Sequence, residues 1–352
     1  MTVAIRADGN RQIGIGHLTR CISLAKALEA EGAECIFVIR DLGYDAKSFV
    51  EGRGFPVRMM PAPEEGFMPA AGAPPHSAWA GMNGAEDAVQ MAKTLSDMEV
   101  SHVIIDHYGY DALWHDAARR ALGCAVIAVD DLADRAMSVD LIIDHNYHPD
   151  HAAKYVDVAA PGTTICGGPD YALLSPLYAD APRWTEEASE GIGIFLGGGD
   201  LLGLAPVFYD RIRAANYSGP VEVVTTSAAS NLAELQSRAE ADPEFVLSLD
   251  LPDLIAFYAR RTVQIGAGGG ASWERCCIGA PAVVTATADN HGVVLNALDA
   301  MGAAISAPRD HAVDVALDLL GDASRRSELS NAARRLVDGH GAARAARAVL
   351  AL

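Results

Sequence analysis

Residues 263–285 have the sequence VQIGAGGGASWERCCIGAPAVVT, which predicts a strand, a glycine-rich turn, a helix and a second strand. The apolar run at 263–265 has the character of a buried strand, and three consecutive glycines follow at 268–270. Gly279 ends the helix, because Pro281 stands two residues later and the next apolar run begins directly after it. A strand, a helix and a further strand in this order form the unit of a parallel sheet, so the segment predicts an α/β fold.

The rest of the chain repeats this alternation. Apolar runs of strand length lie at 3–6, 34–40, 102–106, 125–129, 140–143, 192–196, 221–225 and 282–285. Helical periodicity is expected at 18–31, at 111–122 and in the tail at 317–352. A chain of 352 residues is long enough for two cores, and the composition changes after Tyr178. We therefore expect two Rossmann-like domains, 1–182 and 183–352, with a ligand between them at the carboxyl ends of their strands.

The glycine-rich turn is a candidate binding site for an anion. Gly268, Gly269 and Gly270 leave backbone N–H groups free at the start of the next helix, whose dipole favours negative charge. This arrangement is typical of a diphosphate site that needs no lysine. Ser272 lies in the first turn of that helix, and the carboxylate of Glu274 could accept both hydroxyls of a ribose. The alternative is that the glycines only let helix and sheet pack closely.

A second glycine-rich turn lies near the N-terminus, where residues 13–21 have the sequence IGIGHLTRC. Gly14 and Gly16 allow a tight turn and the close approach of a ligand, and His17 stands at the start of the following helix. The positive end of that helix favours the neutral imidazole, which can accept a proton as a general base. Arg20, one turn further, could contact a substrate or pair with a carboxylate. The alternative for the whole turn is a packing device with a solvent-facing histidine.

Two apolar strands end in the dipeptide Asp-His, at Asp106-His107 and at Asp144-His145. Four such side chains could bind a divalent metal if they converged. The sequence has no pair of histidines at i, i+4 on one helix and no closely spaced set of ligands, so we expect no metal. We interpret the two pairs as polar groups at the edge of a cleft or as strand-end hydrogen-bonding groups.

Charge and composition argue against several classes of partner. The formal net charge of −19 disfavours nucleic acids and anionic membranes, which bind to basic patches. No stretch approaches the roughly 18 apolar residues of a membrane helix. Six cysteines without C-x-x-C spacing are typical of core residues in a reducing compartment, so we expect a cytoplasmic protein. The segment at 61–83, rich in Pro, Ala and Gly, is expected to be a functional loop or a disordered one.

Several ordered blocks of the sequence together resemble one family. They lie at 13–21, 129–135, 140–146, 166–174, 195–200 and 268–277, followed by 289–291, and they cover nearly the whole chain. The family is that of the UDP-2,4-diacetamido-2,4,6-trideoxy-β-L-altropyranose hydrolases of pseudaminic acid biosynthesis, which are similar to UDP-N-acetylglucosamine glycosyltransferases of GT-B fold. The resemblance implies a GT-B-like fold of two facing domains, a role in making the nonulosonic acid of flagellin glycosylation, and no cofactor. The implied partners are a UDP-sugar and other enzymes of the pathway.

The resemblance also implies roles for individual residues. His17 matches the catalytic base, which activates water for inverting attack on the anomeric carbon. Asn290 matches a polar pair that contacts the nucleotide sugar, but the second member is His291 here, where the family more often has Gln. The remaining candidates for the substrate site are Tyr108, Asp131 and Gly198.

Two other functions use the same residues. In an inverting GT-B glycosyltransferase the hydroxyl of an acceptor replaces water, while the donor, the fold and the base stay the same. Such an enzyme would have an apolar and basic acceptor-docking face in its N-terminal half, and no such segment is evident. A nucleotide-sugar-binding regulator would keep the turn at 268–270 but would not need a base at position 17.

Overall fold

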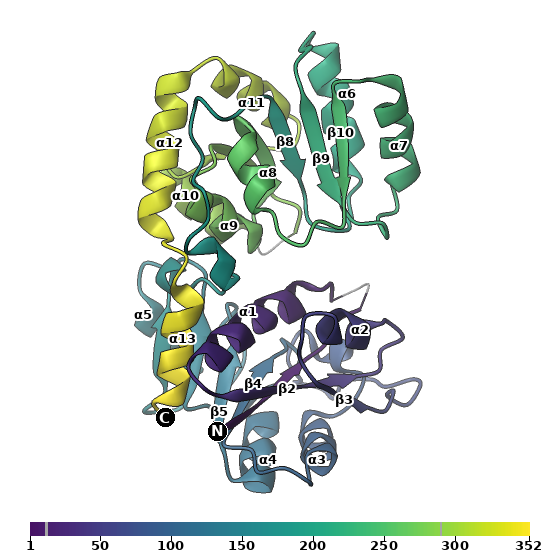
Figure 1. Ribbon diagram of the computed structural model, residues 1–352. Coiled ribbons are helices and arrows are strands. Elements are labelled where there is room, and N and C mark those ends of the chain that lie inside the picture. The colour runs from purple at the N-terminus through teal and green to yellow at the C-terminus, as the bar shows by residue number, and fades with distance from the viewer. Residues whose placement is uncertain (11–12, 289–290) are drawn as a thin grey trace. The chain divides into compact units, whose positions relative to one another are not determined.

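The computed structural model describes residues 1–10, 13–288 and 291–352 (Figure 1). The chain folds into two compact units, of which the first is Met1–Pro176 with His340–Leu352 and the second is Leu177–Gly339.

The C-terminal segment belongs to the first unit because the last helix, α13 (Gly341–Leu350), packs against α1 (Gly16–Ala30). Ala345, Ala346 and Val349 of α13 are buried in the same core as the apolar side chains of α1. The sequence placed the division at residue 182 and left the last helix in the second domain. It did not predict this grouping, because two helices from opposite ends of the chain give no local signal of their pairing.

The first unit contains a sheet of seven parallel strands in the order β3-β2-β1-β4-β5-β6-β7. The strands are β1 (Thr2–Ala7), β2 (Glu34–Arg40), β3 (Val57–Met60), β4 (His102–Asp106), β5 (Ala125–Val129), β6 (Leu141–Asp144) and β7 (Thr164–Gly167). Val3 in β1 pairs with Cys35 in β2 and with His102 in β4. The chain runs outward from β1 to β3 on one side and from β4 to β7 on the other, so the topological switch point lies between β1 and β4.

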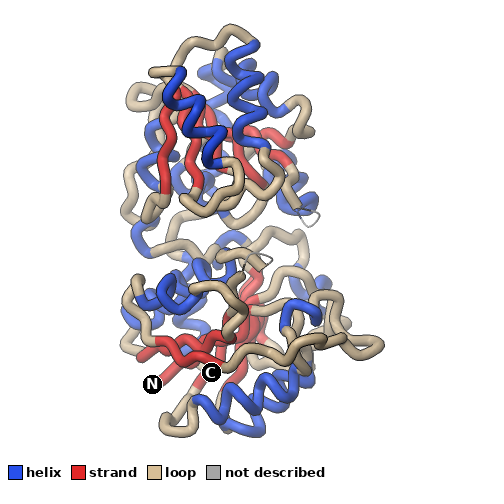
Figure 2. The backbone as a smooth tube through the Cα atoms, turned by 90° about the vertical axis from the view of Figure 1, so that its right-hand side faces the viewer, coloured by secondary structure: helices blue, strands red, loops and turns tan. Residues whose placement is uncertain are grey.

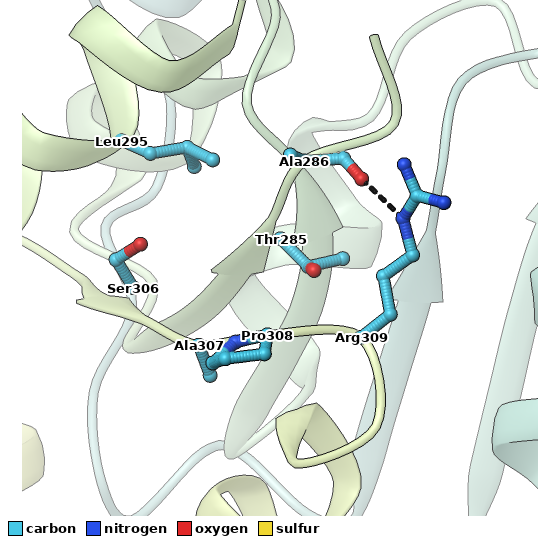
Figure 3. Close-up of a pocket in the computed structure, with 7 residues that line it drawn as sticks. All are labelled: Thr285, Ala286, Leu295, Ser306, Ala307, Pro308 and Arg309. Carbon is cyan, nitrogen blue, oxygen red and sulfur yellow. Dashed lines mark hydrogen bonds between the residues drawn. The ribbon is translucent and has the colours of Figure 1, made fainter. Parts of the chain in front are cut away.

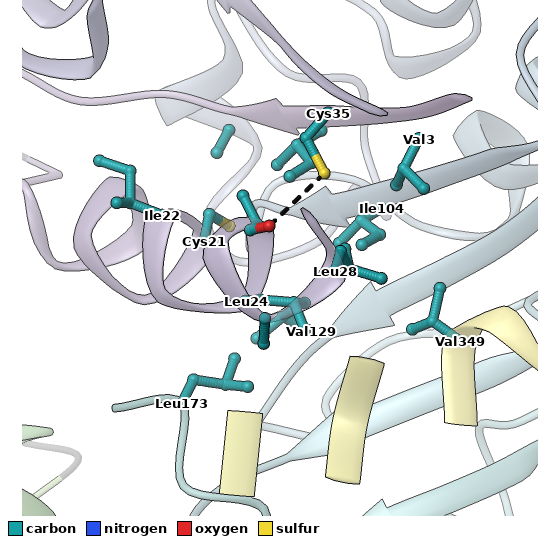
Figure 4. Close-up of a cluster of buried hydrophobic side chains, with 14 of the residues drawn as sticks. Val3, Cys21, Ile22, Leu24, Leu28, Cys35, Ile104, Val129, Leu173 and Val349 are labelled. Atoms are coloured by element: carbon teal, nitrogen blue, oxygen red, sulfur yellow. Dashed lines mark hydrogen bonds between the residues drawn. The ribbon is translucent and has the colours of Figure 1, made fainter. Parts of the chain in front are cut away.

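Helices cover both faces of this sheet (Figure 2). Alternate side chains of a strand point to opposite faces, so Ile5 lies in the core with α1 and α13, whereas Ala4 lies in the core with α3 (Gly84–Thr94) and α4 (Ala112–Leu122). Figure 4 shows the first core, in which Leu24 and Leu28 of α1 and Val349 of α13 gather with strand side chains. The shorter elements are α2 (Ala46–Glu51), α5 (His151–Tyr155), and the 3₁₀ turns η1 (Ser77–Ala80) and η2 (Pro169–Tyr171).

The second unit contains a sheet of six parallel strands in the order β10-β9-β8-β11-β12-β13. The strands are β8 (Ile192–Phe195), β9 (Val221–Thr225), β10 (Phe245–Leu249), β11 (Val263–Ala267), β12 (Ala282–Thr285) and β13 (Ile305–Ser306). The helices are α6 (Leu204–Ala214), α7 (Leu232–Ala241), α8 (Ile255–Arg260), α9 (Ala271–Ile278), α10 (Gly292–Ala300), α11 (Ala312–Leu320) and α12 (Ala323–Leu336), and the turn η3 (Pro176–Tyr178) lies at the unit boundary. Here the switch point lies between β8 and β11.

Two glycines allow helices to approach this second sheet closely. A Cβ at Gly193 would lie 2.9 Å from the ring of Phe257 in α8, and a Cβ at Gly266 would lie 2.7 Å from the guanidinium carbon of Arg275 in α9. On the opposite face, Ile194 and its apolar neighbours pack with α6 and α11.

The two parallel sheets confirm the expected α/β class and the Rossmann-like character of each unit. The strands that the sequence did not predict are β3, β7, β10 and β13, and these are the outer strands of the two sheets. An outer strand has a neighbour on one side only and is partly exposed, so it lacks the continuous apolar run of an inner strand. The prediction of two facing domains with a cleft between them stays a prediction.

Two sequence expectations concern the surroundings of the protein. None of the helices in the described ranges is long and apolar enough to cross a bilayer. All six cysteines are buried and none forms a disulfide, which confirms their interpretation as core residues.

Candidate functional site

The carboxyl ends of β1 and β4 bring the first candidate residues together. Ala7 of β1 pairs with Asp106 of β4, so the loop after β1 starts beside the last residue of β4. Gly14 has a φ of +77°, a conformation that other residues rarely adopt, and it closes the turn that leads into α1. Gly16 is the first residue of α1, and a side chain there would meet no atom within 4 Å. His17 follows at the switch point of the sheet, where open α/β sheets bind ligands.

The imidazole of His17 is held by the carboxylate of Asp106. The Nδ1 atom of His17 lies 2.5 Å from Oδ1 of Asp106, and both side chains are buried. An ionised carboxylate can only accept a hydrogen bond, so in the neutral ring Nδ1 carries the hydrogen and Nε2 keeps its lone pair. His17 is therefore oriented by an acid, with the opposite nitrogen ready to accept a proton, which is the arrangement of a general base.

Arg20 pairs with the same carboxylate, and its contact with a substrate stays a prediction. Its Nε lies 2.6 Å from Oδ2 of Asp106, and a terminal nitrogen lies 2.6 Å from Oδ1. Burial alone would raise the pKa of Asp106, but the charges of Arg20 and His17 outweigh it and hold that pKa well below its usual range. Asp106 is therefore ionised near neutral pH.

Tyr108 and Asp131 lie beside this pair. The ring of Tyr108 meets the imidazole of His17 edge to face with centroids 4.8 Å apart. Its hydroxyl donates to Oδ1 of Asp131 at 2.5 Å, and the amide of Asn146 donates to Oδ2 of Asp131 at 2.5 Å. Burial raises the pKa of Asp131, but the charge of Arg20 and the hydrogen bond from Tyr108 outweigh burial, so the net shift of this pKa is downward. These side chains form a polar wall next to the imidazole.

The two Asp-His dipeptides have different environments. Burial lowers the pKa of His107 to about 4, and burial together with Arg20 lowers the pKa of His145 to about 4, so both rings are neutral near pH 7. Asp144 pairs with Lys154 at 2.6 Å and accepts from the hydroxyl of Tyr155 at 3.2 Å, which makes it a strand-end hydrogen-bonding group. Within the described residues there is no group of three or more His, Cys, Asp or Glu side chains that could hold a metal ion.

Sequence reasoning missed His76 and Trp79, whose rings lie next to Tyr108. They belong to the segment 61–83, which contains the turn η1. The ring centroids of His76 and Trp79 lie 4.6 Å apart, and those of His76 and Tyr108 lie 5.6 Å apart. The only local signal was the presence of aromatic residues in a segment otherwise rich in Pro, Ala and Gly.

The second unit has two glycine-rich turns, at 197–199 and at 268–270, and both lie at the switch point between β8 and β11. Gly197 has a φ of +94°, and the carbonyl of Gly198 accepts from the backbone N–H of Thr226 at 3.0 Å and from its hydroxyl at 2.8 Å. Gly198 thus follows β8, and Gly268 follows the neighbouring strand β11. Both turns start at the edge of the sheet at which a ligand is expected.

The turn at 268–270 packs against the start of α10. A Cβ at Gly268 would lie 2.8 Å from the side chain of Leu295 and 3.2 Å from the Cβ of His291, so only glycine fits there. A Cβ at Gly269 would lie 3.5 Å from Nε2 of His291. His291 directly precedes α10, and Gly270 directly precedes α9, so the N-termini of two helices meet at this turn. Asn290 lies outside the described residues.

The helix α9 contains the other candidates. Ser272 is buried, and its hydroxyl lies 3.4 Å from the carbonyl of Ala267 and 3.0 Å from the guanidinium of Arg275. Arg275, which sequence reasoning missed, is buried beneath the turn, and one of its terminal nitrogens has no hydrogen-bond partner among the described residues. Burial lowers the pKa of His291, and the charge of Arg275 lowers it further. A cation under a glycine-rich turn and two helix N-termini gives this region a positive potential.

Glu274 has an unusual environment for a carboxylate. Burial raises its pKa to about 7, and hydrogen bonding to Tyr178 and the charge of Arg275 offset only part of this effect. The side chain is therefore only about half ionised near neutral pH. A hydrogen-bond donor that arrived at Glu274 would favour the ionised form.

A cavity of about 450 Å³ opens beside this region, at the carboxyl ends of β12 and β13 (Figure 3). Its lining residues are Thr285, Ala286, Leu295, Ser306, Ala307, Pro308 and Arg309. Nε of Arg309 donates to the carbonyl of Ala286 at 2.7 Å and holds the guanidinium at the rim. Leu295 lines this cavity and also packs against the glycine-rich turn.

Comparison with known proteins places this geometry in a wider context. No family model matches the chain. The spore coat polysaccharide biosynthesis protein SpsG of Bacillus subtilis (strain 168) is 21% identical over 355 residues, which cover 97% of this chain and 95% of that protein.

Solved structures resemble the fold over its whole length. The glycosyltransferase SsfS6 of Streptomyces sp. SF2575, complexed with thymidine diphosphate, has a TM-score of 0.61 at 17% identity and covers 100% of both chains. MnaA of S. aureus, in a structure with UDP, has a TM-score of 0.64 at 13% identity and covers 98% of this chain and 95% of that one. At such identities the likeness concerns the fold alone, and it confirms the expected GT-B-like α/β class.

Proposed function

We propose that this protein transfers a sugar from a nucleoside diphosphate sugar to a hydroxyl group, with inversion at the anomeric carbon and with His17 as the general base. The observation that supports the proposal is the 2.5 Å contact between Nδ1 of His17 and Oδ1 of Asp106. It leaves Nε2 as a proton acceptor at the switch point of the first sheet, on a ring that a buried, ionised carboxylate holds in place.

The reaction balances with these groups alone. Nε2 of His17 accepts the proton of the attacking hydroxyl as its oxygen forms a bond to the anomeric carbon. The bond between that carbon and the diphosphate oxygen breaks, and its electron pair leaves with the nucleoside diphosphate. Because the diphosphate is a good leaving group, no second carboxylate is needed as a general acid, in contrast to ordinary glycosidases. General-base catalysis of this kind contributes roughly 10²- to 10⁴-fold.

The second unit supplies the nucleotide site in this proposal. The turn at 268–270, with the N-termini of α9 and α10 and the buried charge of Arg275, would stabilise the departing diphosphate through preorganised dipoles. Glu274 would accept the ribose hydroxyls, and His291 with Asn290 would contact the sugar or the diphosphate. We propose UDP as the nucleotide, in keeping with the structure of MnaA with UDP.

Transfer to an acceptor is our main proposal because the structural neighbours include a glycosyltransferase and the curated relative carries a polysaccharide biosynthesis name. Hydrolysis is the second candidate, and the sequence blocks that resemble the pseudaminic acid hydrolases favour it. In that case water takes the place of the acceptor, and the substrate would be the UDP-linked 2,4-diacetamido-2,4,6-trideoxy-altropyranose. A cytoplasmic location and a metal-independent reaction belong to both versions of the proposal.

One experiment tests the reaction and separates its two versions. The purified protein is incubated with a panel of UDP-sugars in ¹⁸O-water, and the products are followed by NMR and mass spectrometry. Transfer predicts UDP release that accelerates when an acceptor is added, and hydrolysis predicts label on the anomeric carbon of the free sugar. Label on phosphorus would show cleavage of the diphosphate and would contradict both versions.

A further inference from the structure

Three aromatic side chains in mutual ring contact lie next to the candidate base, and we call this cluster the aromatic wall. It consists of His76, Trp79 and Tyr108. The rings of Trp79 and His76 meet edge to face with centroids 4.6 Å apart, the centroids of Trp79 and Tyr108 lie 6.2 Å apart, and Tyr108 meets the imidazole of His17 edge to face at 4.8 Å. Two of the three rings come from the segment 61–83, and the third comes from the loop after β4.

The segment that carries these rings is tied down on the first unit. The hydroxyl of Ser77 donates to the carbonyl of Gly109 at 3.4 Å, and a Cβ at Gly109 would lie 2.7 Å from the carbonyl oxygen of His76. At the ends of the segment, Arg40 donates to the carbonyl of Pro61 at 2.8 Å, and Asn83 caps α3. The wall is therefore held in place without a ligand and is available for binding at little cost in ordering.

The outer surface of the wall is the part that a ligand would meet. Tyr108 is buried behind it, whereas His76 and Trp79 are only partly buried. The other three tryptophans of the chain, Trp114, Trp184 and Trp273, are buried in the cores. Trp79 is thus the one tryptophan that a solute can reach, and the ring of Tyr108 lies next to both Trp79 and His17.

We infer that the aromatic wall is the binding surface for the pyranose ring of an acceptor, the ring whose hydroxyl gives its proton to His17. This inference rests on the proposed function and specifies its acceptor as a sugar. A base must touch the hydroxyl that it deprotonates, so the molecule bound beside His17 is the nucleophile. The partly exposed rings of Trp79 and His76 offer that molecule apolar surface, which suits the C–H face of a pyranose, and the indole N–H of Trp79 is a hydrogen-bond donor.

Polar groups lie beside the wall. Asp131 accepts from the hydroxyl of Tyr108, and Nε2 of His145 lies 3.4 Å from a terminal nitrogen of Arg20. A small number of placed polar groups around an apolar surface is the usual composition of a site for a small ligand. A water nucleophile would make no use of a surface of this size.

The first test measures binding through the fluorescence of Trp79. Iodide quenching is recorded with and without methyl glycosides of glucose, galactose, rhamnose and N-acetylglucosamine, with sorbitol as a control that has no ring. We expect at least one pyranoside to protect the quenchable fraction, and we expect Trp79→Phe to abolish that fraction. If none of the four pyranosides protects more than sorbitol does, the inference is wrong.

The second test separates the wall from the base by kinetics. With the pyranoside that protects Trp79 as acceptor, Trp79→Ala should raise the acceptor KM roughly tenfold, and Trp79→Phe should restore much of it, because the ring stack is worth about one power of ten. The melting temperature of each variant is measured alongside, because a native value shows that the variant is folded. Met68→Ala, an exposed apolar residue of the same segment, is the matched control and should change neither value.

The outcomes distinguish this inference from the proposed function. Protection of Trp79 by a pyranoside without cleavage of any UDP-sugar would retain the sugar site and overturn the function. If the protein cleaves a UDP-sugar but Trp79→Ala has the same acceptor KM as the native protein, the proposed function is retained and the wall is not the acceptor site.

Discussion

The affinity for UDP should rise with pH, and Glu274 should be the cause. Burial raises the pKa of this carboxyl to about 7, so it is mostly protonated at pH 6 and mostly ionised at pH 8. Ribose hydroxyls donate hydrogen bonds, and an ionised carboxylate accepts them much better than a protonated one. Binding of the nucleotide is therefore linked to the loss of a proton from Glu274.

The magnitude follows from this pKa. The ionised fraction of Glu274 rises from about one-eleventh at pH 6 to about ten-elevenths at pH 8. If only the ionised form binds the ribose, the dissociation constant of UDP falls about tenfold over this range, which corresponds to about 1.4 kcal/mol. At pH 7 the complex should release about half a proton to the buffer.

Calorimetry in buffers of different ionisation enthalpy measures both quantities. The terminal phosphate of UDP also titrates near pH 6, so the native protein is compared with Glu274→Gln, which leaves the phosphate unchanged and removes the carboxyl group. We expect the pH dependence of the native protein to exceed that of Glu274→Gln about tenfold, and we expect Glu274→Gln to release fewer protons. Equal pH profiles for the two proteins would refute the assignment of Glu274 to the ribose.

The other predictions concern stability and catalysis. The pKa of Glu274 is about 7 in the folded protein, and its usual value is 4.5. Its contribution to the free energy of unfolding is therefore fully present below about pH 4.5 and is lost as the pH rises through 7. Urea titrations should show this fall in the native protein and a flatter pH profile in Glu274→Gln. His17→Asn should lower kcat at least roughly 10²-fold with little change in UDP affinity, and near-normal turnover would end its assignment as the base. Asp106→Asn should lower kcat and also destabilise the protein by about 3–5 kcal/mol, because it leaves the charge of Arg20 without its partner; an unchanged melting temperature would contradict this account of the ion pair. EDTA should leave activity intact, and reactivation of a chelator-treated protein by Mg²⁺ or Mn²⁺ would instead indicate a metal site.

The sequence alone was sufficient for the inner part of each sheet and for the two glycine-rich turns. An inner strand of a parallel sheet is covered by helices on both faces, so β4, β5 and β6 each contain a short continuous apolar run. Gly14 marks a turn because other residues rarely adopt its positive φ, and Gly268 marks one because a Cβ there would lie 2.8 Å from the side chain of Leu295. The position of His17 at a helix start follows from the same local pattern.

The partners of the candidate base were decided only by tertiary structure. Asp106 is 89 positions from His17, and the two meet because β1 and β4 are neighbours in the sheet, an order that no local pattern specifies. The same order brings Tyr108 to the imidazole, and the docking of segment 61–83 adds His76 and Trp79.

The elements that sequence reasoning missed share one physical cause. Outer strands such as β3 and β13 are partly exposed, and their side chains do not have to be apolar, so their pairing depends on the neighbouring strand. The helix α13 returns to the first unit because α1 offers an apolar face, although the two lie at opposite ends of the chain. Local burial and backbone conformation are encoded residue by residue and can be predicted from the sequence, whereas contacts between distant segments exist only once the sheet has formed.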